Sequence, residues 1–162
     1  MNHTDPTEDQ TRVWKMLADI DICMLVTHQA GTFGGRPMST IPRQDDATVY
    51  LLTDASTTAV ADIEANSAVF LSYQGGGDHV SLTGTATVIR DTALVENLWT
   101  TGAKAFWPDG PKTPGIVVLA VRQMSAEYWD GHNPVVSAAK VVYALATGSE
   151  PDLGLRGHAD LG

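Results

Sequence analysis

Short runs of apolar and β-branched residues recur along this chain, separated by turns rich in glycine, proline and polar residues. Such runs are typical of β-strands. We predict about seven strands, at residues 20–29, 36–43, 48–54, 69–73, 80–89, 116–121 and 127–130. Because these strands do not alternate regularly with helices, the pattern favours a mainly β fold: an antiparallel barrel, closed or split, with peripheral helices.

Helix signals lie between and around these runs. Asp5 as a cap and Pro6 in the first turn predict a helix near the N-terminus. Ser56 is expected to cap a second helix over residues 57–65, with Val60 and Ile63 on its buried face and Asp62 and Glu64 facing solvent. Two more helices are predicted, at residues 92–100 and 135–147. The glycine-containing segments 30–35 and 75–78 are predicted to be turns.

The chain has 162 residues, 43% of them hydrophobic, which suits one domain with one sizeable core. We assign residues 1–148 to this single domain and residues 149–162 to a polar C-terminal tail with little to pack against. No internal repeat or linker interrupts the pattern.

Composition also excludes some classes of partner. Ten Lys and Arg against nineteen Asp and Glu give a net charge of −9, which disfavours binding to nucleic acid or an anionic membrane. The longest apolar runs, residues 116–121 and 141–146, are far shorter than the ~20 residues that span a bilayer. We expect a soluble cytoplasmic protein whose single cysteine, Cys23, is a buried thiol.

The residues alone identify no catalytic centre. The five histidines are scattered, and the single cysteine has no cysteine partner, so no metal site is predicted. No Gly-x-Ser-x-Gly elbow and no Gly-x-Gly-x-x-Gly loop is present. Catalytic residues therefore stay unassigned.

Two local features are compatible with a ligand. Residues 34–40 form a strand that contains two glycines and Pro37, which favours an edge strand with main-chain groups free to bind a planar ring. Residues 52–58 run from a strand end into a helix N-terminus, where amides and hydroxyls can hold a phosphate. An ordinary edge strand and an ordinary helix cap explain the same residues without a ligand.

Six motifs in order resemble a known family, the flavin-binding split barrels related to pyridoxamine 5′-phosphate oxidase, and within it the general stress protein 26 group. They are residues 35–39 (GRPMS), 49–54 (VYLLTD), 80–86 (VSLTGTA), 104–110 (KAFWPDG), 126–130 (AEYWD) and 147–154 (TGSEPDLG). Each motif alone is a weak signal, and their order makes the resemblance strong. It covers nearly the whole chain.

The resemblance implies a homodimer of six-stranded antiparallel split barrels with two FMN sites between the subunits. It implies that FMN is bound by these residues: Arg36, Pro37, Met38, Ser39, Leu52, Thr53, Thr57, Thr58, His79, Phe106 and Trp107. In this assignment the start of the second helix holds the phosphate. Phe106 and Trp107 belong to the loop of the partner subunit that covers the flavin.

The chain departs from the family pattern at the phosphate. Relatives usually carry a lysine where this chain has Thr58 and Ala59. Loss of a charge-assisted contact of about 1.5–3 kcal/mol is expected to weaken FMN binding roughly tenfold to a hundredfold. The spacing of Arg156 and His158 matches an Arg-x-His motif of the oxidases, but we assign it to the polar tail and attribute the match to chance. Synthesis of pyridoxal phosphate itself is therefore not expected.

Three functions stay open at this point. The first is an FMN-dependent oxidoreductase acting on an unknown small substrate. The second is a non-catalytic flavin-binding protein, and the third is a cofactor-free dimeric module. Dimerisation is expected on physical grounds too, because exposed Trp99, Phe106, Trp107 and Trp129 would give a monomer large apolar patches.

Overall fold

The computed structural model describes residues 6–131, 142, 144–148 and 155–162. The helices are α1 (Pro6–Ile20), α2 (Thr58–Ala65) and α3 (Thr92–Asn97), with 3-10 turns η1 (Gln44–Asp46) and η2 (Ala103–Ala105). The strands are β1 (Ile22–Gln29), β2 (Thr32–Ser39), β3 (Ile41–Arg43), β4 (Thr48–Asp54), β5 (Ala68–Gly75), β6 (Asp78–Ile89), β7 (Ile116–Asp130) and β8 (Leu155–Asp160). The predicted helix at 135–147 lies largely outside the described residues; Val142 and residues 144–147 are helical.

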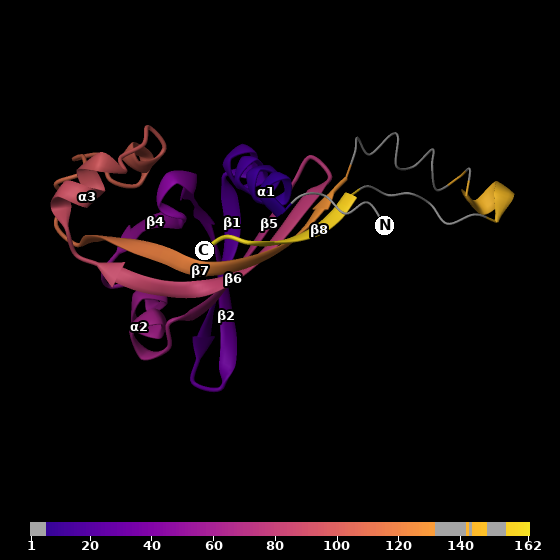
Figure 1. The fold of residues 1–162 in the computed structure, drawn as a ribbon. Coiled ribbons are helices and arrows are strands. Elements are labelled where there is room, and N and C mark those ends of the chain that lie inside the picture. The colour runs from indigo at the N-terminus through magenta and orange to yellow at the C-terminus, as the bar shows by residue number, and fades with distance from the viewer. Residues whose placement is uncertain (1–5, 132–141, 143, 149–154) are drawn as a thin grey trace.

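All the strands pair antiparallel in one sheet of order β2-β1-β5-β6-β7-β4-β3, with β8 added beside β7. The helices lie around this curved sheet (Figure 1). The predicted mainly β, split-barrel class with peripheral helices is therefore confirmed. Over the described residues the strands number eight rather than six, because the short β3 and the C-terminal β8 add to the expected set.

β2 begins earlier than the glycine pattern predicted. Only Ala30 and Gly31 form the turn, with Gly31 at φ +89° in the left-handed region that favours glycine. Gly34 and Gly35 lie inside β2, where they pair with Thr27 and Val26 of β1. Gly34 and Gly35 therefore belong to a strand in which added side chains would meet neighbouring residues on either face. They do not form the loop that we expected.

The prediction of a C-terminal tail with little to pack against is wrong over residues 155–162, the described part of the segment 149–162. β8 pairs with β7 from Leu155 opposite Asp130 to Asp160 opposite Ser125. Ala159 and Leu161 are 3% and 4% exposed and belong to the main core. Apolar and polar residues alternate along this segment, which is the period of a half-buried strand. The division into one domain ending at residue 148 stays a prediction.

Helix boundaries also differ in detail from the predictions. Thr57, not Ser56, is the N-cap residue of α2, and the Ser56 hydroxyl instead donates to Asp54 Oδ1 at 2.6 Å. α3 begins at Thr92 as predicted, after Asp91, whose carboxylate accepts from the amides of the first helical turn, but it ends earlier than predicted, at Asn97. The shift at α2 moves the expected phosphate-binding amides by one residue.

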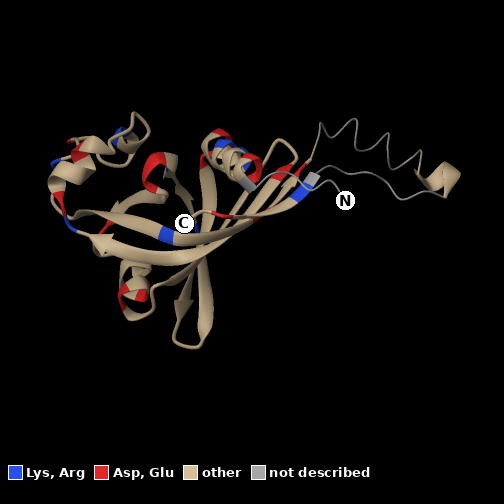
Figure 2. Ribbon diagram, viewed as in Figure 1, with Lys and Arg blue, Asp and Glu red and all other residues tan. Residues whose placement is uncertain are grey.

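Two apolar clusters stabilise the fold. The larger fills the space between the sheet, α1 and α2, and includes Leu25, Leu71 and Leu119, all fully buried. The smaller lies under α3 and includes Tyr50, Val95 and Val118. Acidic side chains concentrate on the helices and turns, and the strands carry few charges (Figure 2). None of the described helices is long and apolar enough to cross a bilayer.

Candidate functional site

The barrel is split between β2 and β4. β3 pairs with β4, Ile41 lying opposite Tyr50 and Arg43 opposite Thr48. If this register continued backward along the chain, Ser39 would lie opposite Leu52 and Pro37 opposite Asp54. No such pairing forms between β2 and β4, both of which the structure describes in full. Among the strands that the structure describes, β2 pairs with β1 alone, and main-chain groups along its other edge have no strand partner there.

Thr40 anchors the chain at the end of the split. The amide of Thr40 donates to the carbonyl of Asp21 at 2.8 Å, and the Thr40 hydroxyl donates to the same carbonyl at 3.0 Å. Asp21 itself has a φ of 66° at the junction of α1 and β1. Thr40 is 3% exposed, so this anchor is buried. It fixes the point at which the chain stops pairing with β1 and passes into β3, which pairs with β4. β2 and β4 diverge on the N-terminal side of this point.

The predicted residues of β2 lie on both faces of the strand. The side chains of Pro37 and Ser39 are exposed on the outer face. Met38 faces inward and packs against the main core. The main-chain groups of Pro37 and Ser39 point to the free edge of β2, whereas those of Met38 point to β1, as expected for a strand that contains proline and lies at the edge of a sheet.

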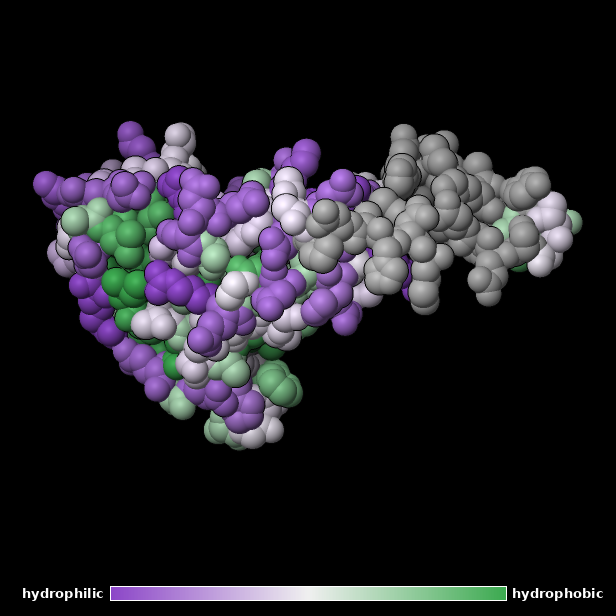
Figure 3. Space-filling model, viewed as in Figure 1, coloured by the Kyte–Doolittle hydropathy of each residue, from purple (hydrophilic) through white to green (hydrophobic). Residues whose placement is uncertain are grey.

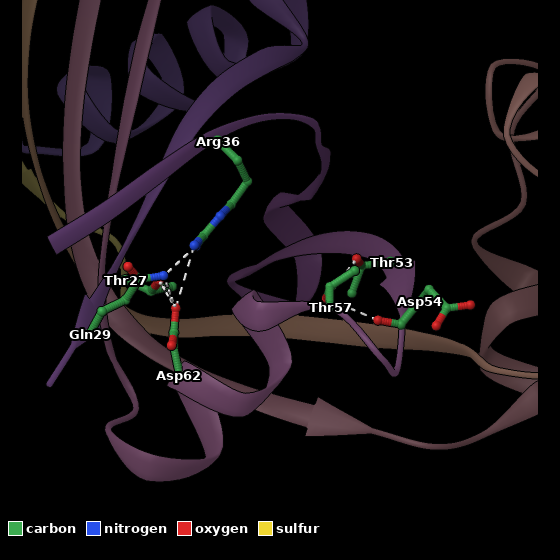
Figure 4. Close-up of polar contacts among 7 residues, drawn as sticks. All are labelled: Thr27, Gln29, Arg36, Thr53, Asp54, Thr57 and Asp62. Carbon is green, nitrogen blue, oxygen red and sulfur yellow. Dashed lines mark hydrogen bonds and ion pairs between the residues drawn. The ribbon is translucent and has the colours of Figure 1, made fainter.

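Leu52 and Thr53 form the facing edge of β4. Because successive side chains alternate, Leu52 packs against the smaller cluster while Thr53, 8% exposed, faces the start of α2. The Thr53 hydroxyl lies 3.4 Å from the Thr57 hydroxyl. The two threonines are thus adjacent where β4 ends and α2 begins (Figure 4).

The α2 N-terminus adds amide donors to this end of the split. The Thr57 hydroxyl donates to the Asp54 carbonyl at 2.9 Å. The amides of Thr58 and Ala59, at the first two helical positions, have no acceptor within the described part of the chain. The Thr58 side chain is exposed, whereas Ala59 is 3% exposed and belongs to the core. The amides can therefore donate hydrogen bonds to an anion.

Arg36 is already engaged by a polar network that joins β1, β2 and α2 (Figure 4). Arg36 Nη1 donates to Thr27 Oγ1 at 2.6 Å, and Arg36 Nη2 lies 3.4 Å from Asp62 Oδ2. The same carboxylate oxygen accepts from the Thr27 hydroxyl at 2.7 Å and from Gln29 Nε2 at 3.0 Å. Hydrogen bonding from Thr27, opposed by desolvation and helped by Gln29 and Arg36, lowers the pKa of Asp62. Asp62 is therefore ionised at neutral pH.

Sequence reasoning missed Thr27, Gln29 and Asp62. Asp62 was assigned to the solvent-facing side of its helix, but its side chain is only 14% exposed. Thr27 and Gln29 are two residues apart on β1 and therefore share a face, which was the one available signal. At the other side of the α2 start, hydrogen bonds from Ser56 lower the pKa of Asp54.

Three predicted residues do not join this group within one chain. His79 lies on β6, with β1 and β5 between it and β2, and its Nδ1 lies 3.1 Å from the Gly77 carbonyl. Trp107 packs on the smaller cluster, with its ring 6.2 Å from that of Trp99. Phe106 is 75% exposed. α3 lies on the other side of the sheet from α2 (Figure 1). It lies beside a hydrophobic surface over the ends of β6 and β7 (Figure 3).

The Arg156 and His158 pair lies on a strand, which corrects its assignment to a tail. Arg156 faces Trp129 and His158 faces Glu127 across the β7–β8 pairing. Both side chains are exposed on one face, and His158 Nε2 lies 3.4 Å from the Ser125 hydroxyl. Because Arg156 and His158 lie within the sheet, their position is no longer a reason to attribute the match to the Arg-x-His motif to chance.

The described part of the chain holds neither a cluster of metal-ligating side chains nor a thiol that is ionised at neutral pH. Within the described ranges no three His, Cys, Asp or Glu side chains gather into a group that could hold a metal ion. Burial raises the pKa of Cys23 to about 12, so this thiol stays protonated in the core.

The two edge strands β2 and β4 approach each other at Thr40 and diverge beside the N-terminus of α2. This arrangement defines a split barrel. The chain matches the family model described as pyridoxamine 5′-phosphate oxidase like over residues 8–152, and it belongs to that family. A search among curated proteins finds no match.

Solved structures share the fold. A protein described as general stress protein 26 from a Jannaschia species superposes with a TM-score of 0.77 at 20% identity, over 95% of this chain and 99% of that one. A general stress FMN/FAD binding protein from Xanthomonas citri gives 0.63 at 22% identity, over 73% and 88%. A pyridoxamine 5′-phosphate oxidase-related, FMN binding protein from Nostoc punctiforme gives 0.60 at 13% identity, over 96% and 94%.

Proposed function

We propose that this chain binds a flavin, FMN, in the split between β2 and β4, and that it does so as a homodimer. The observation that carries the proposal is the unpaired edge of β2 facing the C-terminal half of β4, next to two free amides of α2. Family membership and the flavin-binding descriptions of two structural relatives support it.

The residues present fit the parts of such a ligand. The carbonyl of Pro37 and the amide and carbonyl of Ser39 point away from β1 and can bind the polar edge of a planar ring, with no side-chain acid or base needed. Thr53, Thr57 and the amides of Thr58 and Ala59 can bind a phosphate at the helix N-terminus. A flavin, when bound, supplies the redox chemistry, and this chain holds and orients the ring. We propose an oxidoreductase acting on an unknown small substrate.

A second subunit is proposed to cover the split. Ile22, Met24 and Phe70, on the outer faces of β1 and β5, are 55%, 43% and 38% exposed. Met24 lies opposite Pro37, so this apolar surface is continuous with the outer face of β2. Contiguous apolar surface of this kind marks an interface, and a twofold contact would bury it against its own copy. The exposed Phe106 of the partner is proposed to reach the ring.

Two measurements test the proposal. Purified protein is incubated with FMN and passed through a gel-filtration column, and the protein peak should carry the visible absorbance of flavin. A colourless peak would overturn flavin binding. Sedimentation at micromolar concentration should give about twice the 17.2 kDa of the chain. Met24→Asp should shift it toward monomer, whereas Asn66→Asp, the same charge on the exposed turn after α2, should not.

A non-catalytic flavin-binding protein is the second candidate. It is favoured by the side chains around the split, which are threonines and a carboxylate already engaged by Arg36. Flavin-loaded protein that turns over neither NADH nor NADPH with a panel of acceptors would favour this candidate over the oxidoreductase. The cytoplasmic location stays a prediction of the sequence.

A further inference from the structure

The network around Arg36 bears on which flavin the split prefers. A phosphorylated ligand needs a cation that is free to bind it, and Arg36 is the cation on the three elements that border the split. β2 carries Arg36, β4 carries Asp54, and α2 carries Asp62 and Glu64; with Arg90, which pairs with Glu64, these charges sum to 2 − 3 = −1. A phosphate entering here would meet more negative than positive charge.

The geometry commits Arg36 to Asp62. The Arg36 and Asp62 side chains are 22% and 14% exposed, so solvent screens the pair less than it would screen an exposed pair. Thr27, 1% exposed, donates to Asp62 while it accepts from Arg36, which fixes the relative positions of all three groups. A phosphate can recruit the guanidinium only by breaking contacts that leave Asp62 with fewer partners.

The helix N-terminus replaces this cation only in part. The amides of Thr58 and Ala59, which have no acceptor among the described residues, can donate to a phosphate, but the dipole of one helix contributes less than a charged side chain. The planar ring does not depend on Arg36, because the free edge of β2 binds it through main-chain groups. Ring affinity and phosphate affinity are therefore set by different residues.

We propose that Asp62 holds Arg36 away from the ligand phosphate, so that the split binds FMN and its unphosphorylated form, riboflavin, with similar affinity. The inference rests on the proposed flavin site and names the ligand class that it accepts. Asp62 acts through Arg36 and is a positioning residue.

Equilibrium dialysis of the purified protein against FMN and against riboflavin tests this. In the wild type the two dissociation constants should agree within about tenfold. Asp62→Asn keeps an oxygen acceptor for Thr27 and removes the charge, which releases Arg36. It should tighten FMN binding by about tenfold and change riboflavin binding by less than about threefold.

The matched control is Glu64→Gln, which removes the same charge from the same helix. Glu64 pairs with Arg90 at 2.7 Å and has no contact with Arg36. This variant should leave the ratio of the two constants unchanged. A similar gain in FMN affinity from Glu64→Gln would show that net charge alone is responsible, and would overturn the proposal.

Arg36→Gln keeps the proposal falsifiable even if Asp62→Asn folds poorly. In the wild-type background it should change the FMN-to-riboflavin ratio by less than about threefold, because the guanidinium is not available to the phosphate. Combined with Asp62→Asn, it should abolish the gain. FMN binding a hundredfold or so tighter than riboflavin in the wild type, lost in Arg36→Gln, would overturn the inference and leave the flavin site intact. Failure of both flavins to bind any variant would overturn the proposed function itself.

Discussion

Cys23 and Leu25, in the first half of β1, face the main core, whereas Thr27 and Gln29, further along the same face, contact Asp62 of α2. The first pair is stabilised by burial of apolar area, which is non-directional and tolerates changes of shape. The second pair is stabilised by hydrogen bonds to one carboxylate, which are directional and costly to leave half made. The same face of β1 thus changes from packing in the core to hydrogen bonding at the candidate site between Leu25 and Thr27.

The core half should carry more of the stability. Leu25→Ala removes a fully buried side chain and should lower the free energy of unfolding by about 2–5 kcal/mol. Urea unfolding measures the change. Leu145→Ala, the same substitution at a residue 81% exposed, is the control and should have little effect. A cost for Leu25→Ala no greater than that of the control would contradict the assignment of this half to the core.

Substitutions in the half of β1 that contacts Asp62 should lower the free energy of unfolding by less, but should alter ligand preference. Thr27→Val keeps the shape of a side chain that is 1% exposed and removes the hydroxyl between Arg36 and Asp62. The expected cost is about 1–3 kcal/mol, with a change in the FMN-to-riboflavin ratio. Thr48→Val deletes another buried hydroxyl, which contacts Arg122 and the Asp46 carbonyl. It should lower stability without changing the ratio, and an equal change of ratio in both variants would refute the distinction.

Two neighbouring positions on α2 extend the comparison to the phosphate end. Thr58 is exposed one turn before Asp62, and Ala59 is buried in the core. Thr58→Lys should raise FMN affinity by about tenfold without loss of stability. Ala59→Lys places a charge where the core packs and should lower the unfolding temperature. FMN titration and thermal unfolding separate the two, and the opposite ranking would show that residue 59 faces the ligand.

Low pH should remove the stability that the contacts of Asp62 contribute. The pKa of Asp62 is lower in the folded protein than its ordinary value of about 3.9, so its contacts stabilise the fold above that pH and lose this contribution as pH falls through the folded pKa. The stability difference between wild type and Asp62→Asn should therefore be present near neutral pH and shrink below about pH 4. Urea unfolding at both pH values measures it. A difference that does not depend on pH would contradict the charged role of Asp62.

The sequence predicted the core half of this comparison better than the site half. Most strands were located because apolar residues recur with the period of a strand or in buried runs, as in β4 and β7. The free edge of β2 was predicted because Pro37 cannot donate to a ladder. β8 was missed although Leu155, Ala159 and Leu161 follow the same period, because the segment comes after a predicted helix and looked too polar.

The contacts of Asp62 were not predictable in the same way. They join residues 26 to 35 positions apart on three elements, and no local pattern encodes which side chain of a helix meets which strand. The helical period gave only the buried face of α2, with Val60 and Ile63, and assigned Asp62 to solvent. The family resemblance supplied Arg36 as a ligand residue, but not the carboxylate that engages it.

Two glycines of β2 give the smallest test of the comparison. A methyl group at Gly34 would lie 2.5 Å from Cδ of Gln29, whereas one at Gly35, on the opposite face, would lie 3.6 Å from Met24. Gln29 has a flexible end and can move, so Gly34→Ala should cost no more than about 1 kcal/mol while displacing Gln29 from Asp62. Gly35→Ala fits without a clash and should be neutral or slightly stabilising, because alanine loses less chain entropy than glycine. Thermal unfolding ranks the pair, and the FMN-to-riboflavin ratio should change only for Gly34→Ala. If Gly35→Ala instead abolishes binding of both flavins, the ring lies against the outer face of β2, and the two faces of this strand divide the ligand between them.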